Sequence, residues 1–322
     1  MLLSIIIPVY NLPQKLLQEC INSILAIGLE QSTYEIIIVD DGSAEQIRWI
    51  KTNYPANNIK LIEQPNSGPG GARNTGIETA QGKYIQFVDG DDTLTNHQAS
   101  KQCLALLEKE SPDILRFKHQ RGINARQKKV RFGNTISGAL FMKNNNLPAG
   151  VWCYYIKREL LIRKNIRFST NIYHEDEEFS TIVHYHAKTL IESNALIYNY
   201  RKRKDSITEN RKQEEVEKRL SNRLTITSRL ATFSATMAEQ SNTIQKQALQ
   251  RKLSTLAVDA IINNMQAGKS AEETYQMCRN ELTPLTLYPI QGDYGIKFNI
   301  FKKLANSPIG LTILRYIIPT KR

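Results

Sequence analysis

Short apolar runs rich in β-branched residues alternate with helix-like segments along the first half of this 322-residue chain. The predicted strands are residues 2–9, 35–39, 59–63 and 84–88. The predicted helices between them are residues 14–27, 44–54 and 71–80. Such alternation predicts an α/β fold with a mostly parallel sheet, covered by helices, that binds ligands beyond the carboxyl ends of its strands.

The pattern changes near residue 212. Before it, residues 118–132 lack periodicity and predict a loop or an irregular hairpin, whereas residues 190–200 predict a further strand. After it, from about residue 214 to 265, the spacing is helical and no strand pattern is present. We therefore expect an α/β domain over residues 1–212 and a helical region over residues 213–322.

Acidic residues follow two of the predicted strands directly. Asp40 and Asp41 come after residues 35–39, and the segment Asp89-Gly90-Asp91-Asp92 comes after residues 84–88. Carboxylates can hold Mg²⁺ or Mn²⁺, and they can accept hydrogen bonds from a base or a ribose. Because clustered like charges are unfavourable without a counterion, the second segment predicts a metal site. The alternative is an exposed acidic turn that caps the next helix.

A glycine-rich loop, residues 66–76, enters the predicted helix 71–80 and suggests phosphate recognition at a helix N-terminus. It is not a dinucleotide fingerprint, because Arg73 occupies the position of the third glycine, and it has no P-loop lysine. Arg73 could instead lie near a pyrophosphate as a cation. A surface turn with an arginine at the helix start is the alternative.

Five segments, in this order along the chain, resemble the motifs of glycosyltransferase family 2. They are SIIIPVYN at 4–11, IVDDGS at 38–43, GARNTG at 71–76, FVDGDD at 87–92 and HED at 174–176. The resemblance covers roughly residues 2–208. It implies a GT-A type nucleotide-sugar-binding domain and inversion of configuration at the transferred sugar carbon.

The resemblance also implies roles for individual residues. Asp176 matches the catalytic base, and Asp91 and Asp89 match an Asp-x-Asp signature that holds Mn²⁺ or Mg²⁺. The residues expected to bind the donor are Pro8, Tyr10, Asp40, Asp41, Arg73, Asp89, Gly90, Arg203 and Ser206. Trp152, Tyr154 and Tyr155 could stack on an acceptor sugar or belong to the core.

The expected activity is transfer of a sugar from a nucleotide sugar, by default UDP-hexose or UDP-N-acetylhexosamine, to a saccharide or lipid-linked saccharide in bacterial surface polysaccharide synthesis. A nucleotidyltransferase that makes a nucleotide sugar is one alternative, although residues 8–13 lack the glycine-rich basic loop expected of it. A nucleic-acid-binding protein is the other. It fits poorly because no such signature is present, so we expect no nucleic acid partner.

Basic residues are concentrated in the last third of the chain. Residues 201–322 hold 21 Lys and Arg against 11 Asp and Glu, out of a net charge of +12 for the whole chain. Residues 298–322 mix bulky apolar and basic side chains, which suits either an interfacial membrane segment or helices that pack on the protein or form a dimer. The dispersed cysteines and the N-terminal sequence suggest a cytoplasmic location, with possible contact to the inner face of the cytoplasmic membrane.

Overall fold

A computed structural model describes residues 1–45, 47–122, 128–202 and 212–320. The chain divides into two compact units: residues 1–138 with 149–204, and residues 139–148 with 205–322. The division expected at residues 212 and 213 remains a prediction, and one short segment, residues 139–148, groups with the helical unit although it lies far earlier in the sequence.

The first unit is built on one mixed sheet, which has eight strands within the described residues. The strands are β1 (Leu3–Val9), β2 (Tyr34–Asp40), β3 (Ile59–Glu63), β4 (Tyr84–Phe87), β5 (Thr93–Leu94), β6 (Ile114–Arg121), β7 (Tyr154–Lys157) and β8 (Leu190–Tyr200). Their order in the sheet is β3-β2-β1-β4-β7-β6-β8-β5. Strands β1 to β4 pair in parallel, and β7 runs antiparallel to both β4 and β6.

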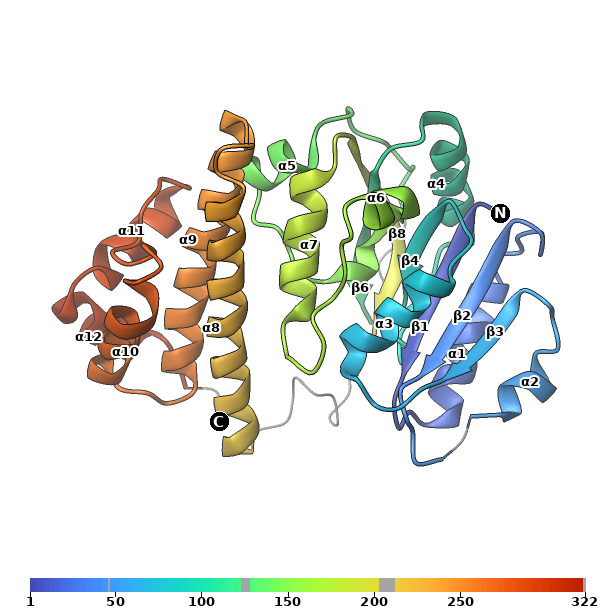
Figure 1. The fold of residues 1–322 in the computed structure, drawn as a ribbon, viewed down its shortest axis with the longest axis horizontal. Coiled ribbons are helices and arrows are strands. Elements are labelled where there is room, and N and C mark those ends of the chain that lie inside the picture. Colours follow the sequence, from blue (N-terminus) through green and yellow to red (C-terminus); the bar gives the residue numbers. More distant parts are fainter. Residues whose placement is uncertain (46, 123–127, 203–211, 321–322) are drawn as a thin grey trace. The chain divides into compact units, whose positions relative to one another are not determined.

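Helices cover this sheet, and Figure 1 shows α3, α6 and α7 in front of it. The helical elements of the unit are α1 (Gln14–Leu25), α2 (Trp49–Asn53), α3 (Gly68–Thr79), α4 (His97–Glu110), the 3₁₀ turn η1 (Val151–Cys153), α6 (Arg158–Arg163) and α7 (Glu175–His186). Helix α7 packs through Phe179, whose ring stacks on Phe168 with centroids 3.7 Å apart and meets Phe87 of β4 edge-on. Apolar contacts of this kind hold α7 against the sheet.

Two predicted segments differ from the structure. The helix expected at 44–54 is reduced to α2, because the Asn11 side chain accepts a hydrogen bond from the backbone N–H of Ala44 and holds the start of the segment in a loop. Strand β6 continues to Arg121, inside the segment expected to be a loop or irregular hairpin. Its polar residues form a strand because β8 pairs with them as far as Tyr200, and such pairing outweighs local preference.

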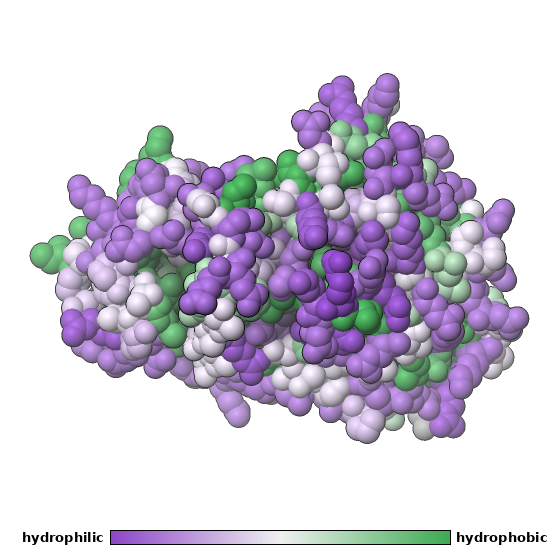
Figure 2. Space-filling view, turned by 45° about the horizontal axis from the view of Figure 1, so that its top comes forward, coloured by the Kyte–Doolittle hydropathy of each residue, from purple (hydrophilic) through white to green (hydrophobic). Residues whose placement is uncertain are grey.

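The second unit is helical. Its elements are α5 (Gly138–Asn144), α8 (Gln213–Thr236), α9 (Thr243–Gln266), α10 (Ala271–Met277), the π-helical turn η3 (Cys278–Leu282), α11 (Ile296–Ala305) and α12 (Pro308–Ile317). A buried apolar cluster joins α9 to α12 and includes Ile261, Met265, Leu282 and Leu311. Hydrophobic groups also project from the surface over α11 and α12 (Figure 2). None of the helices in the described residues combines the length and apolar composition that a membrane crossing requires.

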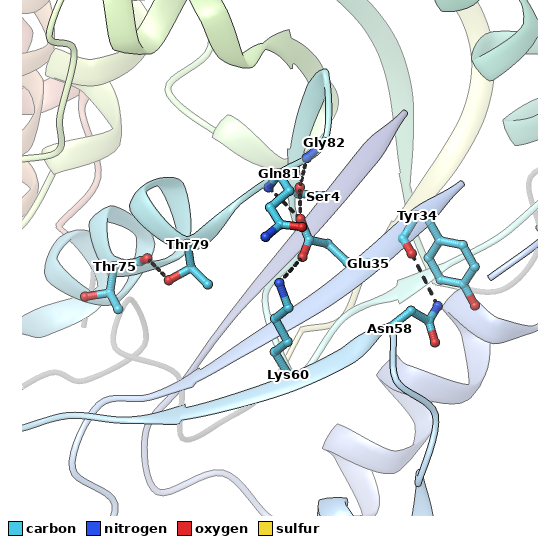
Figure 3. Close-up of polar contacts among 9 residues, drawn as sticks. All are labelled: Ser4, Tyr34, Glu35, Asn58, Lys60, Thr75, Thr79, Gln81 and Gly82. Carbon is cyan, nitrogen blue, oxygen red and sulfur yellow. Dashed lines mark hydrogen bonds and ion pairs between the residues drawn. The ribbon is translucent and has the colours of Figure 1, made fainter. Parts of the chain in front are cut away.

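A buried polar cluster lies near the amino-terminal ends of β1 and β2 (Figure 3). The carboxylate of Glu35 accepts hydrogen bonds from Ser4 Oγ at 2.6 Å, from the backbone N–H of Gln81 at 2.6 Å and from Lys60 Nζ at 2.8 Å. Burial alone would raise the pKa of Glu35, but the hydrogen bonds from Lys60 and Ser4 bring it below its ordinary value. The charged carboxylate thus links the starts of three strands, β1, β2 and β3.

Replacing Glu35 by Gln should lower the free energy of unfolding by about 1–3 kcal/mol at neutral pH, because donors would then face an amide that carries no charge. The lowered pKa means that the ionised carboxylate stabilises the fold above its unfolded-state pKa and loses this effect as the pH falls through its folded-state pKa. The difference from wild type, measured by urea unfolding, should therefore shrink below about pH 4.5. The matched control is Glu63→Gln, whose exposed ion pair with Arg48 should contribute no more than about 0.5 kcal/mol. Equal losses for both variants would contradict this account.

Candidate active site

The acidic segments meet at one edge of the sheet. Strands β1, β2 and β4 are parallel, so the loops that follow Val9, Asp40 and Phe87 leave from the same edge. Strand β8 has the same direction, because β7 is antiparallel to β4 and β6, and β6 is parallel to β8. Carboxyl ends of parallel strands are the usual place for ligands in such sheets.

The two carboxylates after β2 hydrogen-bond within their own loops. Asp40 Oδ1 accepts from the backbone N–H of Ser43 at 3.1 Å. Asp41 Oδ1 accepts from Gln64 Nε2 at 2.7 Å and from the backbone N–H of Ser67 at 2.9 Å. Asp41 thereby ties the end of β2 to the loop before α3. The predicted contacts of both residues with the donor remain predictions.

Two further residues predicted to contact the donor, Pro8 and Tyr10, lie near the end of β1 and are more exposed than Asp40 and Asp41. Tyr10 lies in the loop that follows β1, and 56% of its surface is exposed. Pro8, near the end of the strand, is partly buried. An exposed aromatic ring at this edge is available to a planar ligand group.

Arg73, on α3, lies at the centre of the site with only 7% of its surface exposed. Its Nη2 is 3.0 Å from Asp89 Oδ1, and its Nη1 is 2.7 Å from Glu175 Oε1. The guanidinium carbon also lies 5.4 Å from the centre of the Phe168 ring. Burial alone would lower the pKa of Arg73, but the charges of Asp89 and Glu175 raise it above its ordinary value. Arg73, Asp89 and Glu175, here called the Arg73 triad, link α3, the loop after β4 and the start of α7.

The first turn of α7 is strongly acidic, with Glu175, Asp176, Glu177 and Glu178 in succession. Negative charge is favoured at a helix N-terminus. The pKa of Asp176 is raised by burial and then by the neighbouring charges of Glu175 and Glu177, while Arg73 lowers it. A carboxylate with a raised pKa is a stronger base than an ordinary one, which suits a group that removes a proton.

The three carboxylates in the segment after β4 lie in two kinds of environment, one buried and the other partly exposed. Asp92 is buried, accepts from Tyr198 Oη at 2.6 Å and from the backbone N–H of Arg201 at 2.7 Å, and therefore anchors the loop. Burial, followed by the charge of Asp89, raises the pKa of Asp92 to about 7. Asp89 and Asp91 are partly exposed. Gly90 is buried between them, where an added Cβ would come within 2.8 Å of Leu12 Cδ2.

A divalent cation is compatible with this geometry only if the substrate supplies part of its coordination. Within the described residues no three His, Cys, Asp or Glu side chains gather as a metal site. Mg²⁺, however, is commonly held by one or two carboxylates together with substrate phosphates and water. Asp91 and Asp89 could serve in this way, whereas Asp92 is occupied by Tyr198 and Arg201.

The aromatic residues considered for stacking on an acceptor sugar lie in the core or pack on other rings. Tyr154 and Tyr155 are core residues, each about 1% exposed, so they are not positioned to stack on a sugar. Trp152 stacks instead on Tyr198, with ring centroids 4.7 Å apart. Arg203 and Ser206 lie outside the described residues.

Two residues at the site were not predicted to have a role there. Glu175 pairs with Arg73, and Tyr198 Oη accepts a hydrogen bond from the backbone N–H of Asp89 at 3.1 Å while donating to Asp92. The acidic pair at 175–176 was visible in the sequence, but its partner lies 102 residues away. Tyr198 has no distinguishing feature in the sequence of its strand.

Replacing Tyr198 by Phe should lower the free energy of unfolding by about 1–3 kcal/mol, because the Asp92 carboxylate and the Asp89 N–H would each lose a buried partner. Urea denaturation measures the change. Tyr316→Phe is the matched control, because Tyr316 is 89% exposed and its substitution should have almost no effect. A Tyr198→Phe variant as stable as wild type would contradict the anchoring role.

Comparison with known proteins shows the family to which the chain is similar. Residues 4–166, about half of the chain, match the family described as Glycosyl transferase family 2. The uncharacterised glycosyltransferase EpsJ of Bacillus subtilis (strain 168) is 32% identical over 223 residues, which are 65% of this chain and 63% of EpsJ. The poly(ribitol-phosphate) beta-N-acetylglucosaminyltransferase TarS of Staphylococcus aureus (strain Mu50) is 32% identical over 126 residues, 38% of this chain and 22% of that protein.

A solved structure extends the likeness to the whole chain. The crystal structure of S. aureus TarS 1–349 in complex with UDP-GlcNAc superposes with a TM-score of 0.71 at 20% identity, and the alignment covers 98% of this chain and 89% of that one. This likeness supports the fold expected from the sequence motifs. The chain therefore belongs to glycosyl transferase family 2 and has the GT-A fold.

Proposed function

We propose that this protein is an inverting glycosyltransferase that moves a sugar from a nucleotide sugar to a saccharide or lipid-linked saccharide acceptor. The observation that carries the proposal is the Arg73 triad, because it fixes the acidic loop after β4 beside the helix that bears Asp176. The loop that the triad positions could thus hold a diphosphate through a bound cation, while a neighbouring carboxylate removes a proton. Family membership supports the same reaction.

The donor is proposed to be UDP-hexose or UDP-N-acetylhexosamine. This choice is supported by TarS, which was crystallised with UDP-GlcNAc and is a poly(ribitol-phosphate) beta-N-acetylglucosaminyltransferase. The base and ribose would lie beside Tyr10, Asp40 and Asp41, at the ends of β1 and β2. The setting is proposed to be synthesis of a bacterial surface polysaccharide, at the cytoplasmic face of the membrane.

The diphosphate would lie over the loop after β4, against Asp89 and Asp91. Two anions can meet there only if positive charge compensates them. Mn²⁺ or Mg²⁺ bound by Asp91 and Asp89 would supply that charge and stabilise the leaving nucleoside diphosphate. Arg73 holds Asp89 in place through their ion pair and contributes a further fixed positive charge to the site.

Asp176 is proposed as the base. The acceptor hydroxyl oxygen forms a bond to the anomeric carbon while the bond from that carbon to the diphosphate oxygen breaks. The acceptor proton passes to the Asp176 carboxylate, and the bonding electrons leave with the nucleoside diphosphate. Attack from the face opposite the leaving group inverts the anomeric configuration, so one base is sufficient.

Replacing Asp176 by Asn should reduce transfer at least about 100-fold, because an amide cannot take the proton, whereas UDP affinity should be unchanged. Replacing Asp91 by Asn should also reduce transfer but, in addition, weaken UDP binding in the presence of Mn²⁺. Radiolabelled sugar transfer and isothermal titration with UDP measure the two properties. Asp113→Asn, at the opposite edge of the sheet, is the matched control and should behave as wild type. Normal transfer by Asp176→Asn would refute the assignment of the base.

The pH dependence of kcat/KM offers a separate test of Asp176 as the base. Because burial and neighbouring acids raise the pKa of Asp176, kcat/KM should begin to fall at a pH closer to neutrality than for an ordinary carboxylate. The fall occurs as the pH decreases, since the protonated form cannot act as a base. An acidic limb with an unshifted midpoint near the ordinary value of 3.8 would contradict the proposed environment.

A further inference from the structure

Helices α11 and α12 each use one side to complete the core of the helical unit. On α12, Gly310, Leu311 and Leu314 are buried. Gly310 approaches α11 so closely that an added Cβ would lie 2.0 Å from the carbonyl oxygen of Leu304. Ser307 caps α12 by accepting a hydrogen bond from the backbone N–H of Gly310 at 3.0 Å. The pair is therefore a well-anchored part of the unit, and its outer side has a defined orientation.

The outer side of the same two helices is also apolar. We call it the α11–α12 outer face and define it by Ile296, Ile300, Ile309, Ile313 and Tyr316. Their exposed fractions are 80%, 58%, 78%, 44% and 89%. The spacing of Ile309, Ile313 and Tyr316 places them on one side of α12. Hydrophobic groups stand out of the surface in this region in Figure 2.

A helix that is apolar on both sides is normally buried on both sides. Large exposed apolar side chains gathered on neighbouring helices usually mark a surface that binds something. The inner side is accounted for by the buried cluster that includes Leu311 and Leu314. Within the described residues, the outer isoleucines do not belong to this buried cluster or to the side chains packed against it.

The charged residues on α11 and α12 themselves are all positive, whereas Asp293, just before α11, accepts a hydrogen bond from Asn299 at 2.6 Å. Between residues 294 and 320 the sequence contains Lys297, Lys302, Lys303 and Arg315 but no Asp or Glu. Lys297 and Lys303 are exposed on α11, where Lys303 shares the side of Ile296 and Ile300. The face therefore combines apolar side chains with positive charge at their margins.

We propose that the α11–α12 outer face docks on an anionic lipid surface. Each helix has 10 residues, too few to cross a bilayer, so the two would lie in the interfacial plane with their isoleucines among the upper acyl chains. The lysines would then contact lipid phosphates. Self-association through this face is disfavoured, because a symmetric dimer would bring the two sets of positive charges together.

This inference is independent of the residues proposed for sugar transfer, and it deepens the proposed function by naming the surface on which a lipid-linked acceptor would be met. It predicts that the intact protein cosediments with vesicles of phosphatidylglycerol and phosphatidylcholine, but much less with phosphatidylcholine alone. Added salt should weaken the binding, since exposed charges are screened.

Two sets of substitutions separate the contribution of the positive charges to vesicle binding from that of the apolar side chains. Lys297→Gln with Lys303→Gln should weaken binding to the anionic vesicles about 30-fold, since each basic residue near such a surface contributes about fivefold. Ile309→Ser with Ile313→Ser and Tyr316→Ser should reduce vesicle binding to the background level, while keeping the melting temperature because these side chains are exposed. Ile162→Ser, at an exposed isoleucine on α6, is the matched control and should bind as wild type.

Several results would overturn the proposal. They are absence of vesicle binding at low salt, equal binding by wild type and the triple serine variant, and a dimer in sedimentation velocity that the serine substitutions dissociate. The last result would make the face a contact between copies of the chain. Thermal stabilisation by UDP with Mn²⁺, measured on the same variants, reports on the proposed function separately and should be unchanged by substitutions on α11 and α12.

Discussion

The candidate site depends on one buried cation. Arg73 lies between Asp89 and Glu175 with little exposure to water, and removing such charges from solvent is costly unless each is well paired. A guanidinium can satisfy two carboxylates at once because its donors point in different directions from a rigid plane. The cation therefore constrains three elements together: α3, which carries it, the loop after β4, and the first turn of α7.

Close packing around the triad has the same effect. Gly70, in the first turn of α3, faces the segment before α7 so closely that an added Cβ would lie 2.3 Å from the carbonyl oxygen of Ser169 and 3.2 Å from Glu175 Cγ. Phe168 lies beneath the guanidinium and stacks on Phe179 of α7. The glycine-rich start of α3 is thus explained by packing against this segment, whether or not it also contacts a phosphate.

Carboxylates at the sheet edge divide according to burial. Asp92 and Asp41 are buried and hold loops in place through Tyr198 and Ser67, while Asp89 and Asp91 remain partly exposed. A site that binds an anionic diphosphate needs both kinds, because the loop must keep its shape when its exposed carboxylates acquire new partners. The anchoring residues are as necessary to the proposed chemistry as those that would touch the donor.

Local patterns were sufficient to predict most of the α/β fold and the edge that carries the acidic residues. Apolar runs located β1, β2 and β4 within a residue or two at each end. Strand β6 was underestimated because its polar second half is stabilised by pairing with β8, a contact distant in sequence. The partnership of Arg73 with Glu175 and the role of Tyr198 were beyond prediction for the same reason, since spacing along one segment carries no information about which distant side chain completes a buried pair.

The candidate site requires Arg73 to engage two carboxylates at once, and replacing Arg73 by Lys tests this most directly. Lysine keeps the positive charge but lacks the planar guanidinium, whose nitrogens can donate to two carboxylates at once. The value of kcat/KM for sugar transfer should therefore fall at least about tenfold, which is a loss of about 1.4 kcal/mol in transition-state stabilisation. Arg116→Lys, at an arginine that forms an ion pair with Glu192 of β8, should leave kcat/KM close to wild type. Wild-type kcat/KM in the folded Arg73→Lys variant would contradict the account.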